Sequence, residues 1–278
     1  DLNLNSKELE KFIKKDNIKI IFTPYSRGLS YTLGEISKKY SINAMCISHG
    51  TVVPYKNDLE KIENMNIARS VIYNEYPYIS LQTKLADAFF KQNPNDSKLI
   101  KTGPIVFTNL NTLKKKKIIK VLHASTYKNK KNIKFWGVET PFEFLESLKD
   151  LINVFKVNPE YELHIKLHPS FEIECNKNDL IEVLNLSKNI KICKNRIDKE
   201  LIDTNILISY SSTTIEEALV NKIPVILFDK WNRYNHFNSY NLDENNYAPR
   251  PLYYSTKTEN IIKNIKKINN SKLTNSIN

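Results

Sequence analysis

The sequence predicts an α/β fold of two facing Rossmann-like domains, each with a parallel sheet. Short apolar, β-branched runs alternate with helical patterns, and strands joined through helices pair in parallel. The alternation is interrupted once, by a segment rich in asparagine and lysine. The length of 278 residues also exceeds that of most single domains. We therefore expect domains over residues 1–106 and 117–278, joined by a linker at 107–116.

The first domain is predicted to be a run of βα units that ends near Thr102. Its expected elements are, in chain order, a strand at Ile18–Phe22, a helix at Leu29–Tyr40, a strand at Ile42–Ile47, the segment Ala68–Tyr73, a helical stretch near Ile79–Phe90 and a strand at Lys98–Lys101.

The second domain repeats the alternation more clearly. A long helix is expected over residues 140–156, because Thr140, Pro141 and Glu143 form an N-terminal capping pattern. The other helices are expected near 178–186, 198–203 and 213–221 and, rich in lysine, within 257–278. Strands are expected at 118–123, 161–167, 189–193, 205–209 and 223–228.

The composition argues against several classes of protein. The net charge is +12, but the lysines are dispersed, whereas nucleic-acid-binding proteins gather arginine and aromatic residues on one element, so no nucleic-acid partner is expected. Cys46, Cys175 and Cys193 lack disulfide or zinc-ligand spacing and no Asp-x-Asp pair occurs, so no metal or other cofactor is expected. No apolar run is long enough to span a bilayer. We expect a cytoplasmic protein.

Ligands of parallel α/β sheets bind beyond the carboxyl ends of the strands, so the residues after each strand are the candidate site. Ser48, His49 and Gly50 follow the strand at Ile42–Ile47. The glycine permits a sharp turn, and His49 has the chemistry of a general base. The alternative is a histidine that only hydrogen-bonds a loop.

A second histidine follows the strand at 161–167. Pro169 holds the preceding residue extended, which directs His168 out of the sheet edge, where it can donate to a phosphate beside the basic Lys166. His164 lies in the middle of the same strand, so a structural role is expected for it.

The most specific stretch is a run of hydroxyl residues at the predicted start of a helix. Free N–H groups and the positive end of the helix dipole bind phosphate there. The alternative is a capping box, in which the hydroxyls only close the helix. Glu216 and Glu217 cannot both be the capping partner of one residue, so one of them is free to accept hydrogen bonds from ribose. The residues concerned are Ser211, Ser212, Thr213, Thr214, Glu216 and Glu217.

Two other strand ends carry weaker signals. Ser125 and Thr126 are small residues that allow a ligand to approach closely after the strand at 118–123. Arg233 and Tyr234 belong to a loop after the strand at 223–228, which is equally consistent with a substrate-facing loop and with a loop packed by its own aromatic side chains.

In their order along the chain, these motifs resemble GT-B glycosyltransferases of bacterial surface-polysaccharide synthesis. The motifs are His49-Gly50-Thr51, the basic residue ahead of His168-Pro169, Ser211-Ser212 and Lys222-Ile-Pro-Val-Ile226. They are most similar to the CDP-glycerol glycerophosphotransferase (teichoic acid polymerase) family and to the CMP-sugar capsule transferases, including polysialyl- and Kdo-transferases.

The resemblance implies roles for individual residues. His49 matches a catalytic base near the acceptor, and His168 matches a histidine that contacts the donor phosphate. Ser211 and Ser212 match the pair that holds this phosphate, and Glu217 matches the acid that meets the ribose. The implied partners are a nucleotide-activated donor, CMP- or CDP-linked, and a glycan or lipid-linked acceptor, with peripheral contact at the cytoplasmic face of the inner membrane.

Two departures from this pattern occur. Ser209 stands where retaining GT-B enzymes carry a further glutamate, so the retaining mechanism is not supported. The first domain contains about half the strands usual for the fold, which predicts a missing N-terminal part or a short variant. Two other functions stay open, a GT-B nucleotide-sugar 2-epimerase and a non-catalytic protein that binds nucleotide sugars or polyanions.

Overall fold

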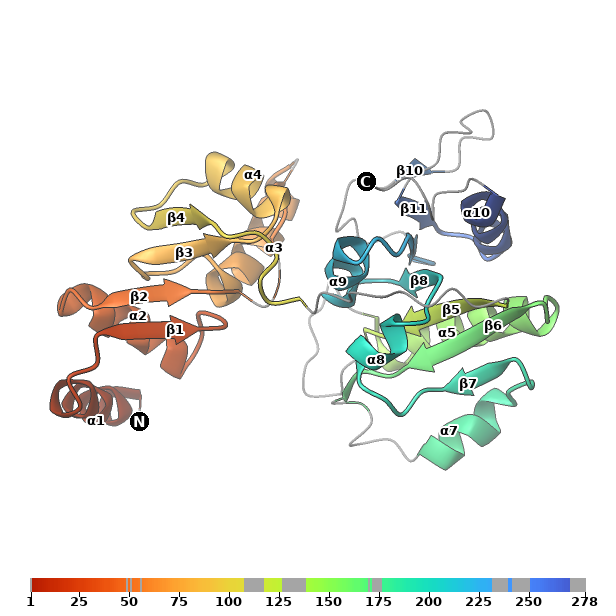
Figure 1. Cartoon of the computed structure of the whole chain (residues 1–278), viewed down its shortest axis with the longest axis horizontal. Coiled ribbons are helices and arrows are strands. Elements are labelled where there is room, and N and C mark those ends of the chain that lie inside the picture. The colour runs from red at the N-terminus through yellow and green to blue at the C-terminus, as the bar shows by residue number, and fades with distance from the viewer. Residues whose placement is uncertain are drawn as a thin grey trace. The chain divides into compact units, whose positions relative to one another are not determined.

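The computed structural model describes residues 2–48, 50, 52–55, 57–107, 118–126, 139–169, 171, 177–231, 240–241 and 251–270. The chain divides into two compact units, Asp1–Phe107 and Thr108–Asn278, which we call the N-terminal and the C-terminal unit (Figure 1). Each unit contains a parallel sheet with helices packed on it. This confirms the predicted α/β class.

The N-terminal unit has a four-stranded sheet in the order β1-β2-β3-β4. Every connection steps to the next strand in the same direction, so right-handed crossovers place the connecting helices on one face. The elements are α1 (Leu2–Lys15), β1 (Ile20–Thr23), α2 (Leu29–Lys39), β2 (Asn43–Cys46), α3 (Asp58–Val71), β3 (Tyr78–Leu81), α4 (Lys84–Gln92) and β4 (Lys98–Lys101).

The covered face of this sheet holds the core of the unit. Ile21 and Cys46 pack with Ile13 of α1 and Ile36 of α2, and further strand residues pack with α3 and α4. The alternate residues of β1 point the other way, and Ile20 and Phe22 are 59% and 63% exposed.

One prediction for this unit is wrong. The helical stretch expected near Ile79–Phe90 begins later, because Ile79 to Leu81 belong to a strand, and the preceding segment Ala68–Tyr73 begins in the last turns of α3. Ala68 and Ile72 are buried four residues apart, as on one face of a helix. The third strand is β3, and α4 begins after Thr83, whose hydroxyl accepts the N–H of Ala86 at 3.1 Å.

The C-terminal unit has a seven-stranded sheet in the order β10-β11-β9-β8-β5-β6-β7. Its strands are β5 (Ile119–Ala124), β6 (Tyr161–Lys166), β7 (Ile190–Ile192), β8 (Ile206–Ser209), β9 (Val225–Phe228), β10 (Tyr240–Asn241) and β11 (Leu252–Ser255). The described helices are α5 (Pro141–Lys156), α7 (Lys177–Leu184), α8 (Ile197–Leu201), α9 (Thr214–Val220) and α10 (Glu259–Asn270). The strands β10 and β11 were not predicted.

Successive residues of the strands in this unit point to opposite faces, and both faces are covered. Val121 and Ile208 pack against α5, α7 and α10, whereas Leu122 and Leu207 pack against α8 and α9. The start of α5 forms as the sequence predicts. The Thr140 hydroxyl accepts the N–H of Glu143 at 3.3 Å, and the Glu143 carboxylate accepts the N–H of Thr140 at 2.9 Å. The three-layer arrangement leaves the strand ends as the place for ligands.

None of the described helices is long and apolar enough to cross a lipid bilayer.

Candidate functional site

The direction of the crossovers in the C-terminal unit reverses between β5 and β8. From β5 the chain steps outward through β6 to β7, and it returns to the other side of β5 as β8, β9 and β11. This is the strand order of a doubly wound Rossmann fold, in which ligands bind at such a switch point. Ala124 at the end of β5 pairs with Lys166 of β6 and with Ser209 of β8. The three strands therefore end level with one another.

Ser125, directly after β5, holds the backbone segment that carries His168 after β6. Its N–H donates to the carbonyl of Lys166 at 3.0 Å, and its Oγ accepts the N–H of His168 at 3.2 Å. Ser125 is buried and His168 is half-buried. The structure thus brings together two of the predicted site residues and holds the backbone of the second in place.

The hydroxyl run after β8 begins at the same edge. Ser209 donates from Oγ to the carbonyl of Ala124 at 2.8 Å, which ties the end of β8 to β5. Two residues later Ser211 is half-buried at the carboxyl end of the sheet. The predicted hydroxyls therefore begin beside the strand that carries Ser125.

The capping boxes considered for this helix do not form. Thr213 is the N-cap of α9, and its side chain makes no capping bond. Instead the Ser212 Oγ accepts the N–H of Thr214 at 3.2 Å and donates to the Thr214 hydroxyl at 3.1 Å. Ser212 performs the capping because it precedes the N-cap and reaches the first turn from outside. Glu216 is buried, and Glu217 is half-buried.

Sequence reasoning missed an acidic side chain at this edge. Glu139 is buried, and its carboxylate lies 3.4 Å from the hydroxyl of Thr126. Burial raises the pKa of Glu139 to about 7, and the nearby charge of Asp229 acts in the same direction. Asp229 is itself buried directly after β9 and accepts the Tyr254 hydroxyl at 2.8 Å. The available signal was an acid directly ahead of the capping pattern at Thr140.

Three predicted site residues, His49, Arg233 and Tyr234, lie outside the described part of the chain. The neighbours of residue 49 are described. The buried Ser48 donates from Oγ to the carbonyl of Gly50 at 2.6 Å and accepts the Gly50 N–H at 3.1 Å. The side chain of Gln82 also donates to the carbonyl of Ser48. Position 49 is thus flanked by residues that hydrogen bonds hold to each other and to the loop after β3.

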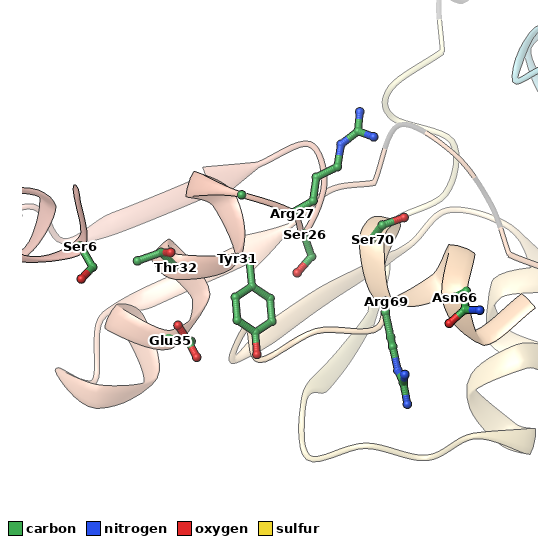
Figure 2. Close-up of a pocket in the computed structure, with 10 residues that line it drawn as sticks. Ser6, Ser26, Arg27, Tyr31, Thr32, Glu35, Asn66, Arg69 and Ser70 are labelled. Carbon is green, nitrogen blue, oxygen red and sulfur yellow. The ribbon is translucent and has the colours of Figure 1, made fainter. Parts of the chain in front are cut away.

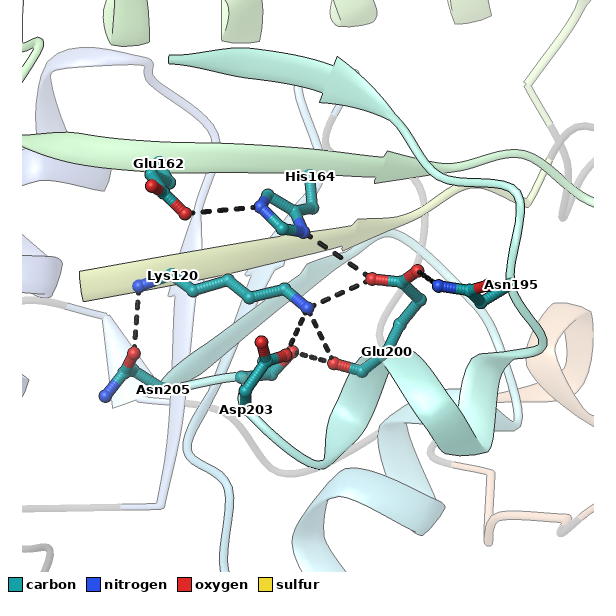
Figure 3. A network of polar contacts seen from close by, with 8 residues as sticks. Lys120, Glu162, His164, Asn195, Glu200, Asp203 and Asn205 are labelled. Atoms are coloured by element: carbon teal, nitrogen blue, oxygen red, sulfur yellow. Dashed lines mark hydrogen bonds and ion pairs between the residues drawn. The ribbon is translucent and has the colours of Figure 1, made fainter. Parts of the chain in front are cut away.

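His164 belongs to a buried polar cluster on the face of the sheet that α8 covers (Figure 3). A ring nitrogen of His164, the Cys193 Sγ and a Glu200 carboxylate oxygen lie within 4.8 Å of one another, as metal ligands do. However, the Lys120 ammonium lies 3.0 Å from the Glu200 carboxylate and also binds Asp203. Lys120 already supplies the positive charge that a metal ion would supply, and we interpret the cluster as an ion-pair network that anchors α8.

No protein-family profile and no curated protein sequence matches the chain. Similar folds occur among solved structures. The UDP-GlcNAc 2-epimerase of Methanocaldococcus jannaschii, in complex with UDP-GlcNAc and UDP, has a TM-score of 0.59 at 14% identity, over 96% of this chain and 74% of its own. The wall teichoic acid polymerase TagF, soaked with CDP-glycerol, has a TM-score of 0.53 at 13% identity, over 92% and 65%. TarM has a TM-score of 0.51 at 16% identity, over 95% and 51%.

These similar proteins are GT-B fold enzymes, and the chain shares that fold. At such low identity the likeness defines the fold alone. The chain spans between about half and three quarters of the length of these proteins.

Proposed function

We propose that the protein is a GT-B glycosyltransferase that moves a sugar or polyol unit from a nucleotide-activated donor to an acceptor. The observation that carries this proposal is the placement of Ser125, His168 and the hydroxyl run directly after the adjacent strands β5, β6 and β8, at the switch point of the C-terminal sheet. The likeness to enzymes solved with UDP-GlcNAc and with CDP-glycerol supports a nucleotide-activated donor.

In this proposal the C-terminal unit binds the donor. The hydroxyls of Ser211, Ser212, Thr213 and Thr214 bind the phosphate oxygens. His168 and Lys166 offset the negative charge that develops on the departing nucleotide, since fixed donors stabilise charge that develops in the transition state. Thr126 and Ser125 border the donor, and Glu217, more exposed than Glu216, accepts hydrogen bonds from the ribose. Arg233 and Tyr234 belong to a substrate loop.

The N-terminal unit binds the acceptor, a glycan or lipid-linked molecule, at the cytoplasmic face of the membrane. His49 accepts the proton of the acceptor hydroxyl as its oxygen forms a bond to the transferred unit. The bond from that unit to the nucleotide phosphate breaks at the same time, and the nucleotide leaves with the electron pair. We propose a CMP- or CDP-linked donor, by the resemblance of the motifs.

The test measures donor binding and turnover in the natural protein and three variants. We expect calorimetry to show saturable binding of CDP or CMP to the natural protein, and the double variant Ser211→Ala/Ser212→Ala to bind at least roughly tenfold more weakly. His168→Ala is expected to lower turnover by roughly 10²–10³-fold, as for loss of one charge-stabilising donor. Ser187→Ala, a hydroxyl change ahead of the edge strand β7, serves as the control. Normal turnover of folded His168→Ala would exclude the role of this histidine.

A second function is favoured by one observation, the TM-score of 0.59 with a UDP-GlcNAc 2-epimerase. An epimerase acts on its nucleotide sugar without an acceptor. Incubation with UDP-GlcNAc alone, followed by separation of the products, distinguishes the two functions. Formation of the 2-epimer would replace the transferase proposal, and unchanged UDP-GlcNAc would exclude the epimerase.

A further inference from the structure

A cavity of about 460 Å³ lies in the N-terminal unit, where the loop after β1 enters α2 (Figure 2). Its lining includes Ser26, Arg27, Gly28, Tyr31, Glu35 and Arg69. The loop follows the carboxyl end of β1, which is the edge at which ligands of parallel sheets bind. The cavity is therefore placed to hold a ligand of the N-terminal unit.

The start of α2 offers backbone donors to this cavity. The helix has 11 residues, and its N-cap is Gly28, which makes no side-chain capping bond. The N–H groups of the first turn, from Leu29 to Tyr31, have no partner within the helix by its geometry. Gly28 has φ 55°, which favours glycine, and a Cβ built there would meet no atom within 4 Å. No side chain at position 28 thus closes the start of the helix.

Ser26 adds an independent sign of a ligand. The residue is 2% exposed, and its Oγ has no hydrogen-bond partner among the described residues. Its backbone N–H donates to the carbonyl of Ser70 at 3.2 Å, which fixes the residue against α3. Figure 2 shows its hydroxyl directed between Tyr31 and Arg69. A buried hydroxyl without a partner destabilises the fold, and an acceptor oxygen in the cavity would satisfy it.

The charge of the lining is positive. Arg27 and Arg69 are two of the five arginines of the chain, and neither forms an ion pair with any described residue. In Figure 2 the two side chains extend in opposite directions, that of Arg27 toward the top of the view and that of Arg69 toward the bottom. Arg27 also lies 5.0 Å from the ring centre of Tyr25. Glu35 is the single acidic residue among those that line the cavity. Arginine presents a planar pair of donors that matches phosphate and carboxylate.

We propose that this cavity binds an oxyanion, a phosphate or carboxylate group carried by the acceptor. The proposal deepens the proposed function and rests on it for one step, the identification of the ligand as the acceptor. Tyr31 and Arg69 also line a second cavity of about 880 Å³, which extends to Asn43, Tyr78 and Lys98 at the starts of β2, β3 and β4.

The test begins with small anions and the full chain. Inorganic phosphate, glycerol 3-phosphate and glucuronate are titrated by calorimetry, so that phosphate and carboxylate ligands are distinguished. We expect saturable binding of at least one of them, weakened at least roughly tenfold in Arg27→Gln/Arg69→Gln, and weakened in Ser26→Ala. Arg196→Gln is the matched control, because its side chain is 86% exposed in the other unit and we expect it to bind as the natural protein does.

Amide chemical shifts locate the bound anion. We expect the signals of Gly28 to Tyr31 to move on addition of the anion that binds, and those of Thr213 to Ile215 to move with nucleotide. An absence of binding by all three anions, or equal binding by the double arginine variant, overturns the proposal. Circular dichroism of each variant shows whether it is folded, and the single variants Arg27→Gln and Arg69→Gln replace the double variant if it is not.

The failure of this proposal is distinguishable from that of the proposed function. If nucleotide binds but none of the anions does, the anion site is wrong and the transferase proposal stands. If the anions shift the signals of Gly28 to Tyr31 but no nucleotide binds, the transferase proposal fails. If both bind, the double arginine variant is expected to raise the KM for the acceptor at least roughly tenfold with an unchanged KM for the donor. An unchanged acceptor KM overturns the acceptor as the ligand.

Discussion

The backbone N–H of His168 donates a hydrogen bond of 3.2 Å to the side-chain oxygen of Ser125. The two residues are 43 positions apart in the chain and follow adjacent strands, β6 and β5. A serine at the end of one strand thus holds the turn that carries the histidine of the next. The Ser125 hydroxyl has two acceptor lone pairs, and this bond occupies one of them. Its O–H donor and one lone pair are left for other partners.

Loss of this bond is expected to weaken nucleotide binding while the fold is retained. Ser125→Ala removes one neutral hydrogen bond, worth about 1 kcal/mol, which corresponds to roughly fivefold in affinity if the turn must be re-ordered on binding. Calorimetric titration with CDP measures the change. Ser187→Ala is the control, since the Ser187 hydroxyl bonds Asn189 ahead of β7, away from the site. Equal affinities of the two variants would show that Ser125 does not position the turn.

Removal of the ammonium from the buried ion-pair network is expected to destabilise the C-terminal unit. Lys120 is 2% exposed and donates to the carboxylate of Glu200 at 3.0 Å and to the Glu200 carbonyl at 2.9 Å. Lys120→Met keeps the chain length but leaves the Glu200 and Asp203 carboxylates without their counter-charge. An ion pair broken in this way costs about 3–5 kcal/mol.

The free energy of unfolding, from denaturant titration, checks this expectation. Lys149→Met is the control, because Lys149 is exposed on α5. Addition of Glu200→Gln to Lys120→Met is expected to restore part of the loss, since it removes one unpaired charge. A loss for Lys120→Met no greater than that for Lys149→Met would mean that the network contributes nothing to stability.

The local patterns of the sequence were sufficient for most of the fold. Thr140, Pro141 and Glu143 predicted the start of α5 because a capping box is a local arrangement. The helix expected near Ile79–Phe90 wrongly included residues of β3, because a short apolar run fits a strand or a buried turn of helix equally well, and packing decides between them. Strand β11 was not predicted. It pairs with β9, which lies more than twenty residues earlier in the chain, and the local sequence does not indicate such a pairing.

The candidate site was less predictable than the fold. Ser125 and His168 were predicted as site residues because each follows a strand, and the carboxyl ends of parallel strands lie at one edge of the sheet. Their direct contact depends on the register of Ala124 with Lys166, which one sequence does not reveal. Glu139 was missed because its environment, Thr126 and Asp229, comes from two distant strand ends. The roles of His49 and His168 stay predictions.

Ionisation of Glu139 is expected to make stability depend on pH. Burial raises its pKa from 4.5 to about 7, so between these values the folded state binds a proton that the unfolded state releases. The stabilisation by the protonated acid is complete below about pH 4.5 and is lost as the pH rises through about 7, up to about 3 kcal/mol in total. Glu139→Gln removes this dependence.

Unfolding at about pH 5 and about pH 8 compares the two proteins. We expect Glu139→Gln to match the natural protein near the lower pH and to exceed its stability near the higher one. Glu182→Gln, an exposed site on α7, is expected to show no such difference. A natural protein whose stability is constant over this range would contradict the burial of an acid at position 139.

Replacement of Asn264 is expected to stabilise the protein. The side chain is 0% exposed on α10, and neither its oxygen nor its nitrogen has a hydrogen-bond partner among the described residues. Its neighbours on the helix, Ile261, Ile265 and Ile268, belong to the apolar core beneath β9 and β11. A buried amide without partners costs about 1–3 kcal/mol, and leucine has a similar shape without this cost.

Asn264→Leu should raise the free energy of unfolding by a comparable amount, measured by denaturant titration against Asn269→Leu at an exposed position of the same helix. If Asn264→Leu instead lowers stability while Asn269→Leu is neutral, the amide is hydrogen-bonded in the folded protein and contributes to the packing of α10.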